Sequence, residues 1–236
     1  MAVFDVTSGV SYATLSAAIT GSVANDVLWL DAGSYVENFP NITHNLTIEQ
    51  NPTLAGTGLV TLTNPQALPP NGRAVLNVPG DLNVSLSIAG LEIYGANNDV
   101  LGNGNGAAIL FETGNATLTV NNCWIHNNED GILTGGNDAA NPQGMTIDLT
   151  NSQVDHNGAP VGSPRYGLDH NVYIGAASAF VASGNNIHDA LGGHEIKSTA
   201  LANTITGNVL SDGLTAPTSY RGGSGNSDRA IGGFPA

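Results

Sequence analysis

The sequence predicts an all-β fold, a single-stranded right-handed parallel β-helix (a β-solenoid) with a short capping helix near the N-terminus. Three observations lead to this prediction. Apolar residues recur in columns, glycine or asparagine recurs at one bend position, and three short strand-like segments follow one another in each repeat. The composition agrees, because 31 glycines and only 10% charged residues suit many tight turns and few exposed helices.

The stretch LTVNNCWIHNNEDGIL, residues 118–133, is the clearest copy of the repeat. It has two short strands and part of a third, with bends at Asn121-Asn122 and Asn127-Asn128. Its residues Val120 and Ile125 belong to two apolar columns that are five positions apart in every repeat. The first column is Ile88, Val120, Leu149, Ala182 and Ile205, and the second is Ile93, Ile125, Val154, Ile187 and Leu210. Successive members of the first column are 32, 29, 33 and 23 positions apart, so the core spacing is constant while the loops vary.

The bend between these two columns always falls on a residue that tolerates left-handed backbone angles. These residues are Gly90, Asn122, Asn151, Gly184 and Gly207. A third apolar column follows the second bend and consists of Ile109, Ile132, Val172 and Ile196. Parallel stacking of three strands per coil explains all three features. An antiparallel sandwich is the alternative, but it gives no reason for a constant bend residue.

We expect residues 1–236 to form one domain with a helical start and an irregular end. In the segment 11–24, Leu15, Ala18 and Ile19 have helical spacing after a polar start, which predicts an amphipathic helix that covers the first rung. The coils then occupy residues 26–213, and residues 214–236 have little strand signal. The earliest strands are expected at 27–30, 35–36, 45–49, 59–62 and 73–78.

The charge balance excludes several classes of partner. Five basic residues stand against 19 acidic ones, which gives a formal charge of −14, so we expect no binding to nucleic acid or to anionic membranes. No apolar stretch approaches the ~18 residues of a membrane span. The carboxylates suit calcium, and a salt-tolerant extracellular surface is the alternative explanation. The lone Cys123 excludes an internal disulfide and is expected to be a packed thiol.

The chain resembles the pectin-lyase-like right-handed parallel β-helix superfamily. The opening YATLSAAI and NDVLWLDAGSYVEN resemble its capping helix and first coil, and LTVNNCWIHNNEDGIL and ITGNVLSDG resemble its inner coils. The resemblance runs from about residue 10 to 213. Because that superfamily holds lyases, hydrolases, epimerases, phage tailspikes and adhesins, it implies the fold more specifically than the activity. The first residues show no signal-peptide pattern, which leaves a cytoplasmic protein, export by another route, or a trimmed chain. We expect an extracellular protein.

The resemblance implies that the third-column strands line a substrate groove, and the long loops 134–146 and 157–169 flank them. Asn171, Tyr173, Glu195 and Lys197 adjoin column members and are expected to face outward as one polar patch. Lys197 is the single lysine of the chain. It is the candidate catalytic base or carboxylate-binding cation. A surface ion pair with an aromatic neighbour is the alternative.

Two positions before the column members come Asp130, His170 and His194, which should stack as a second ladder. Histidine transfers protons near neutral pH, and Asp169 or Asp130 could orient it. Satisfying the backbone of the turns is the alternative role. Arg165 is a second candidate cation, and Glu112 with Asp130 are candidate calcium ligands. A further column of His126, Asp155 and His188 is interpreted as solvated turn residues.

Two functions follow from these residues. The first is a secreted enzyme that acts on an acidic polysaccharide as a lyase or C5-epimerase. Lys197, His170, His194 and Tyr173 would be its catalytic residues, and Glu195, Asn171, Arg165 and Asp169 would contact the substrate. The second is a non-catalytic extracellular structural or adhesive module. It would form homo-oligomers end to end through an uncapped C-terminal rung.

Overall fold

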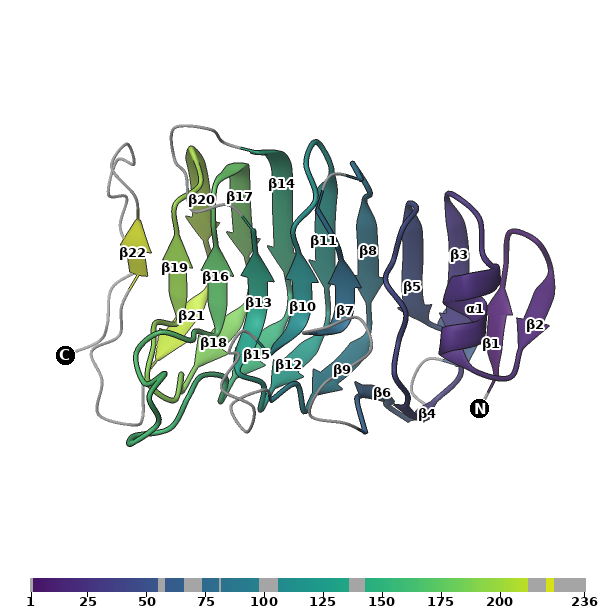
Figure 1. The fold of residues 1–236 in the computed structure, drawn as a ribbon, viewed down its shortest axis with the longest axis horizontal. Coiled ribbons are helices and arrows are strands. Elements are labelled where there is room, and N and C mark those ends of the chain that lie inside the picture. Colours follow the sequence, from purple (N-terminus) through teal and green to yellow (C-terminus); the bar gives the residue numbers. More distant parts are fainter. Residues whose placement is uncertain are drawn as a thin grey trace.

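The computed structural model describes residues 2–54, 58–65, 74–80, 82–97, 106–135, 143–211 and 220–222. Within these residues the regular secondary structure is almost entirely β, with the strands gathered in three sheets (Figure 1). Most neighbouring strands are parallel, which is compatible with a β-helix. No helix in these ranges is long and apolar enough to span a membrane.

Each sheet has its own set of strands, and their spatial order is as follows. Sheet A contains β2 (Val10–Tyr12), β1 (Val3–Asp5), β3 (Asp26–Leu30), β5 (Leu46–Gln50), β8 (Leu86–Ala89), β11 (Thr117–Asn121), β14 (Gln143–Thr150), β17 (Ala177–Ser183) and β20 (Ala202–Thr206). Sheet B contains β4 (Gly33–Val36), β6 (Val60–Thr63), β9 (Leu91–Tyr94), β12 (Trp124–His126), β15 (Gln153–Asp155), β18 (Asn186–His188) and β21 (Val209–Ser211). Sheet C contains β7 (Ala74–Val78), β10 (Ala107–Phe111), β13 (Asp130–Thr134), β16 (Val172–Ile174), β19 (Ile196–Ser198) and β22 (Tyr220–Gly222).

From β8 onward the chain visits sheets A, B and C in turn, so each coil adds one strand to every sheet. The register confirms the three predicted columns. In sheet A, Val120 pairs with Ile88 and Leu149; in sheet B, Ile125 pairs with Ile93 and Val154. In sheet C, Ile132 pairs with Ile109 on one side and with Val172 on the other. The column side chains face inward into one continuous apolar core, and all of them except the partly buried Ile205 are buried.

The bends between sheets A and B have the predicted left-handed conformation. Asn122 and Asn151 have φ of 51°, and Gly90 has φ of 70°. The bends between sheets B and C are also left-handed, at Asn127, His156 and Asp189. Asparagine favours such positions because its short side chain can hydrogen-bond locally. The constant bend residue therefore follows from backbone geometry.

Helix α1 (Leu15–Gly21) lies beside β1 and β2 at the N-terminal end (Figure 1). Thr14 caps it by accepting the amide of Ala17, and its Leu15, Ala18 and Ile19 are buried as the sequence predicts. The helix is shorter than the predicted 11–24, because residues 11 and 12 belong to β2. The hairpin of β1 and β2 extends sheet A in antiparallel fashion, which the sequence did not reveal.

The remaining boundaries match the expected strands closely, and a 3-10 turn, η1 (Pro52–Leu54), follows β5. The irregular tail predicted for residues 214–236 is wrong at one place. Residues Tyr220–Gly222 form β22, which pairs in parallel with β19. The other residues of that segment lie outside the described part of the chain.

Candidate functional site

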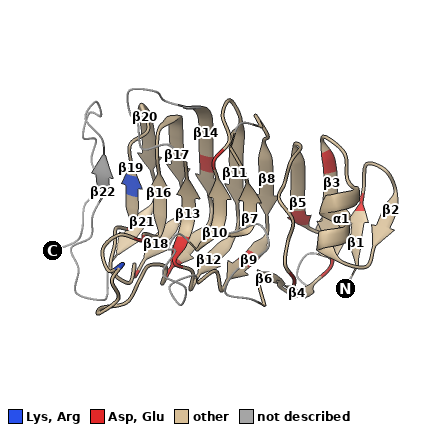
Figure 2. Cartoon of the chain, viewed as in Figure 1, with Lys and Arg blue, Asp and Glu red and all other residues tan. Residues whose placement is uncertain are grey.

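The outward column of sheet C changes from apolar to polar residues along its length. Leu110 and Leu133 are adjacent in register and buried, and Tyr173 packs against their cluster half-exposed. Lys197 follows next to Tyr173, with its Nζ 4.5 Å from the centre of the tyrosine ring. Figure 2 shows the basic residue on β19, one strand beyond β16. The predicted stacking of Tyr173 and Lys197 is confirmed, and both side chains remain partly accessible.

Two histidines lie against this pair, at the entrance to β16 and β19. The ring of His170 is 5.0 Å from that of His194 and 5.5 Å from that of Tyr173, measured between centroids. Its Nε2 lies 3.4 Å from the Nζ of Lys197. The structure thus brings together all four residues that the sequence predicts to be catalytic.

The hydrogen bonds of His170 define where its proton lies. Its Nδ1 accepts the backbone N–H of His194 at 2.9 Å. A neutral imidazole has one accepting and one donating nitrogen, so the proton belongs on Nε2. Nε2–H then faces the ammonium group of Lys197, which also only donates. His170 is 0% exposed, so the partly accessible ammonium of Lys197 is the donor of this pair that an anionic oxygen atom can reach.

Burial keeps His170 neutral. Loss of water around the ring, together with the positive charge of Lys197 and the neighbouring His194, lowers the pKa of His170 from 6.5 to about 3. Burial and the charge of Asp130 raise the pKa of the Tyr173 hydroxyl. Near neutral pH this site therefore holds a neutral imidazole and a protonated phenol.

Asp130 stacks next to His170, as the predicted ladder requires, but it does not orient the imidazole. Its Oδ1 accepts the backbone N–H of His170 at 2.8 Å. Burial, followed by the charge of Asp169, raises the pKa of Asp130 well above its usual range. Asp130 thus stabilises the turn, which is the structural role that the sequence left open.

The prediction that Asn171 and Glu195 face outward is wrong. Both side chains are buried, with 0% and 2% of the residue exposed. The Nδ2 of Asn171 donates to Glu195, and its Oδ1 accepts from the backbone and side chain of Asn157. The reason is the strand boundary, because β16 begins at Val172 and β19 at Ile196. Both residues therefore belong to the bend, where the alternation of a strand does not apply.

Arg165 lies in the long loop 157–169, and its guanidinium is held by two carboxylates. It forms ion pairs with Asp169 and with Glu129, whose Oε1 lies 2.6 Å from the Arg165 Nε. Both acidic side chains are at most 1% exposed. The structure thus gives Arg165 and Asp169 a role in fixing this loop, and their contacts do not direct them to a substrate. Glu129 was not predicted from the sequence, although the pair Glu129-Asp130 is a rare run of two acids in a chain with few charges.

The two candidate calcium ligands do not fit a common site. Asp130 pairs in register with Ala107 at the start of β10, whereas Glu112 follows the end of that strand. Glu112 is five positions beyond Ala107, the register partner of Asp130. In extended chain this places the two acidic residues roughly 16 Å apart along the strand direction. In the described ranges, no group of three or more histidine, cysteine, aspartate or glutamate side chains is placed to hold a metal ion. Cys123 is buried, and burial raises the pKa of its thiol to about 11, which is typical of a packed thiol.

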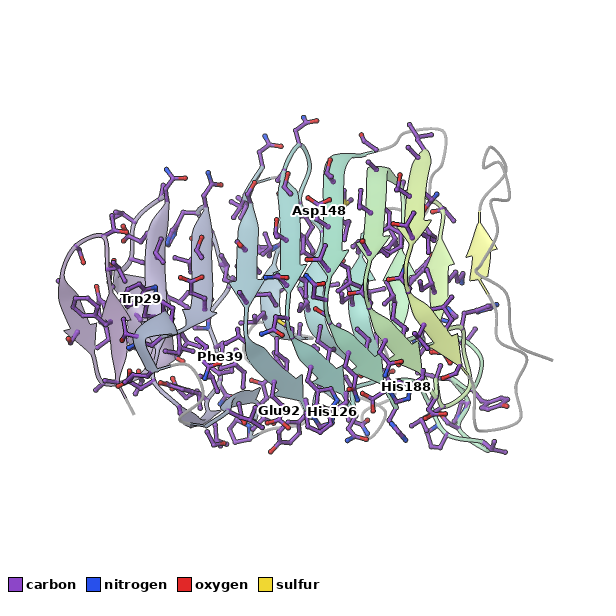
Figure 3. The ribbon with its side chains drawn as sticks, turned by 180° about the vertical axis from the view of Figure 1, so that it is seen from behind. Trp29, Phe39, Glu92, His126, Asp148 and His188 are labelled. Atoms are coloured by element: carbon purple, nitrogen blue, oxygen red, sulfur yellow. The ribbon has the colours of Figure 1, made fainter. Side chains whose placement is uncertain are left out.

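His126 and His188 point outward from sheet B (Figure 3), and Asp155 pairs with both in register. The interpretation as solvated turn residues is wrong for His126 and Asp155, which are 8% and 4% exposed. They end strands β12 and β15, and neighbours cover them. His126 stacks on the ring of Trp124 at 4.0 Å, and its Nε2 lies 3.1 Å from Glu92.

No protein-family model, no curated protein and no solved structure matches this chain. Its function therefore has to be argued from the chemistry of the sheet C residues.

Proposed function

We propose that this chain is a secreted right-handed parallel β-helix protein that acts on an acidic, uronate-containing polysaccharide, by β-elimination or C5 epimerisation. The observation that carries the proposal is the partly accessible ammonium of Lys197, which lies over the Tyr173 ring and 3.4 Å from the Nε2 of the buried His170. A uronate carboxylate supplies the anionic oxygens that such an ammonium would bind. Neutral sugars give it no comparable partner.

The chemistry of uronates explains why this binding would accelerate a reaction. Removing the proton from C5 pushes negative charge onto the carboxylate, and donors aimed at that charge lower the barrier. In this proposal Lys197 binds the carboxylate and the buried His170 positions Lys197. The adjacent ring of His194 accepts the C5 proton. Tyr173, whose raised pKa keeps it protonated, donates a proton.

Two outcomes follow from the same intermediate. In elimination, the C4–O bond breaks, a double bond forms between C4 and C5, and the leaving oxygen takes the proton of Tyr173. In epimerisation, the proton returns to C5 from the opposite face and no bond to oxygen breaks. Neither proposed step uses calcium, since the two candidate ligands among the described residues, Asp130 and Glu112, lie apart.

The test is turnover of a panel of acidic glycans, including polygalacturonate, alginate and glycosaminoglycans. Elimination is followed by the ultraviolet absorbance of the unsaturated uronate, and epimerisation by exchange of the C5 proton in heavy water. We expect Lys197→Ala to lower the rate at least 100-fold while the circular dichroism spectrum is unchanged. His188→Gln on sheet B is the matched control. Absence of both reactions for every glycan, with and without added calcium, would overturn the proposal.

A structural module remains the second candidate, and one observation favours it. Leu201 and Val209, at the start of the last described strands of sheets A and B, are 55% and 60% exposed. Such apolar residues at a strand edge favour end-to-end association. Light scattering that shows mass rising with concentration, without turnover of any glycan, would support this candidate over the enzyme.

A further inference from the structure

A hollow lies away from sheet C, along the edge where sheet A bends into sheet B. It encloses about 340 Å³ and crosses four successive coils. Its floor is the bend column, which is Gln50, Gly90, Asn122 and Asn151. Its wall comes from sheet B and the residue before it, chiefly Leu59, Glu92, Trp124 and Gln153. Since stacked strands are about 4.8 Å apart, the hollow has the length of a short oligosaccharide.

Gln50 packs closely against Gly90 in the floor of this hollow. The two coils that follow have asparagine at the same bend, whereas Gly90 has no side chain. A Cβ atom there would lie 3.1 Å from the Cβ of Gln50, which is tighter than an ordinary contact. The left-handed backbone alone does not require glycine, because Asn122 and Asn151 adopt it too. The missing side chain therefore lets Gln50 lie against the bend as part of the lining.

Trp124 is held in one orientation beside this space. Its Nε1 donates to Asp155 at 2.7 Å, and its ring stacks on His126 at 4.0 Å. His126 lies two residues further along β12, away from the bend, so the other side of the indole borders the hollow. The residue is 38% exposed. A rigid, accessible indole is a surface on which the C–H face of a pyranose ring can stack without ordering the side chain first.

The polar groups around Trp124 are also fixed before any ligand arrives. The Glu92 carboxylate accepts from Thr61 and contacts His126. The Gln50 amide donates to the carbonyl of Gly58, and that of Gln153 donates to Asp155. These amides and carboxylates have hydrogen-bonding positions left for sugar hydroxyls. The described residues of the lining include glutamate and no lysine or arginine, so the hollow disfavours a uronate.

We propose that this hollow is a binding site for neutral sugar residues, centred on Trp124 and distinct from the sheet C cluster. It would hold a neutral stretch or side branch of a glycan, or a separate neutral glycan, by stacking on the indole and by hydrogen bonds to Glu92, Gln50 and Gln153. The site goes beyond the proposed reaction, since it needs neither Lys197 nor His170.

The chain has two tryptophans, which makes the test direct. In a Trp29→Phe protein, Trp124 is the sole indole, so its fluorescence reports the hollow. We expect cello-, xylo- or mannohexaose to shift this emission with saturation, and oligogalacturonate to bind at least tenfold more weakly. By calorimetry, Trp124→Ala should lose at least tenfold in affinity. Trp29→Ala is the matched control, because Trp29 is also an outward indole whose N–H donates to a carboxylate, that of Glu49.

Two more variants separate this site from a folding defect and from sheet C. Gly90→Asn keeps a residue that tolerates the left-handed bend but displaces Gln50 from the lining, so it should abolish binding. Thermal unfolding of this variant checks that the fold is kept. Lys197→Ala should leave neutral-sugar binding unchanged. The proposal fails if none of the three hexaoses binds, if Trp29→Ala weakens binding as much as Trp124→Ala, or if oligogalacturonate binds equally well.

Discussion

Two columns of histidines and carboxylates, one on sheet B and one beside sheet C, differ in what each histidine faces. On sheet B, His126 contacts Glu92 and His188 contacts Asp189. On sheet C, His170 faces Lys197 and His194, and the nearby Asp130 is bonded to backbone instead of to the imidazole. The first arrangement gives each histidine a carboxylate partner, whereas the second places two hydrogen-bond donors next to each other. The contrast shows that a place in a stacked column does not fix the neighbours of a histidine.

The largest expected effect concerns the pH dependence of stability through His170. Its pKa is lowered from 6.5 to about 3, so between these pH values the unfolded chain binds a proton at this histidine and the folded protein does not. This contribution is fully present above pH 6.5 and is lost as the pH falls toward 3; its upper bound is about 5 kcal/mol. His170→Gln removes it, so the free energy of unfolding should fall less steeply with acid than in the wild type. Urea denaturation from pH 3 to 7 measures this.

Asp130 works in the opposite direction and has to be separated from His170. Its raised pKa means that the folded state keeps a proton at higher pH than the unfolded state does. That contribution is present at low pH and is lost as the pH rises through the folded pKa. Asp130→Asn should therefore leave the acid-side loss due to His170 in place. Parallel curves for wild type and His170→Gln would contradict the neutral imidazole.

The next effect tests the loop that borders the sheet C cluster. Arg165→Met should cost about 3–5 kcal/mol, because it leaves the buried carboxylates of Glu129 and Asp169 uncompensated. Chemical denaturation at pH 7 gives the value. Adding Asp169→Asn to the variant should recover part of the loss. A change below about 1 kcal/mol, the range of an exposed pair, would mean that Arg165 is available for another role, including the substrate contact that the sequence predicted.

A smaller loss of stability is expected at the bend between sheets B and C. Asn157 is fully buried in the bend between sheets B and C, and its amide donates to two backbone carbonyls and to Asn171. Asn157→Ala leaves these acceptors unpaired and should cost about 1–3 kcal/mol. Thermal and urea unfolding measure the loss. An equal loss in the exposed bend variant Asn127→Gly would contradict the assignment to buried hydrogen bonds.

The smallest effect is expected on sheet B. His188 and Asp189 form a pair that is partly exposed, with side chains 18% and 24% accessible. His188→Gln should change stability by less than about 1 kcal/mol, and less again in high salt. A loss of stability as large as that of Arg165→Met would contradict the expectation that the sheet B column contributes less to stability than the ion pairs of Arg165.

The sequence predicted the stacked columns and their bends because both are set locally. An inward position recurs wherever a strand repeats, and a left-handed bend selects glycine or asparagine at the same offset, as at Gly90 and Asn122. The juxtaposition of His170, Tyr173, His194 and Lys197 followed from that register. Only the correct alignment of β16 with β19 was needed to predict that these four side chains lie together.

The rest depended on details that alignment does not determine. The burial of Asn171 and Glu195 turns on whether the strand begins one residue earlier or later. The ion pair of Glu129 with Arg165 depends on the path of a long loop, which has no periodic pattern. Strand β1 has only three residues, too few for a period of two to be recognised.

The most direct test of the central claim is nitrogen-15 NMR of the His170 imidazole, assigned with His170→Gln. We predict a neutral ring at pH 5 with the proton on Nε2, and a shift of that signal when a uronate oligosaccharide is added but not when a neutral one is. A protonated imidazolium at pH 5, a proton on Nδ1, or no response to any uronate would contradict the account of this site.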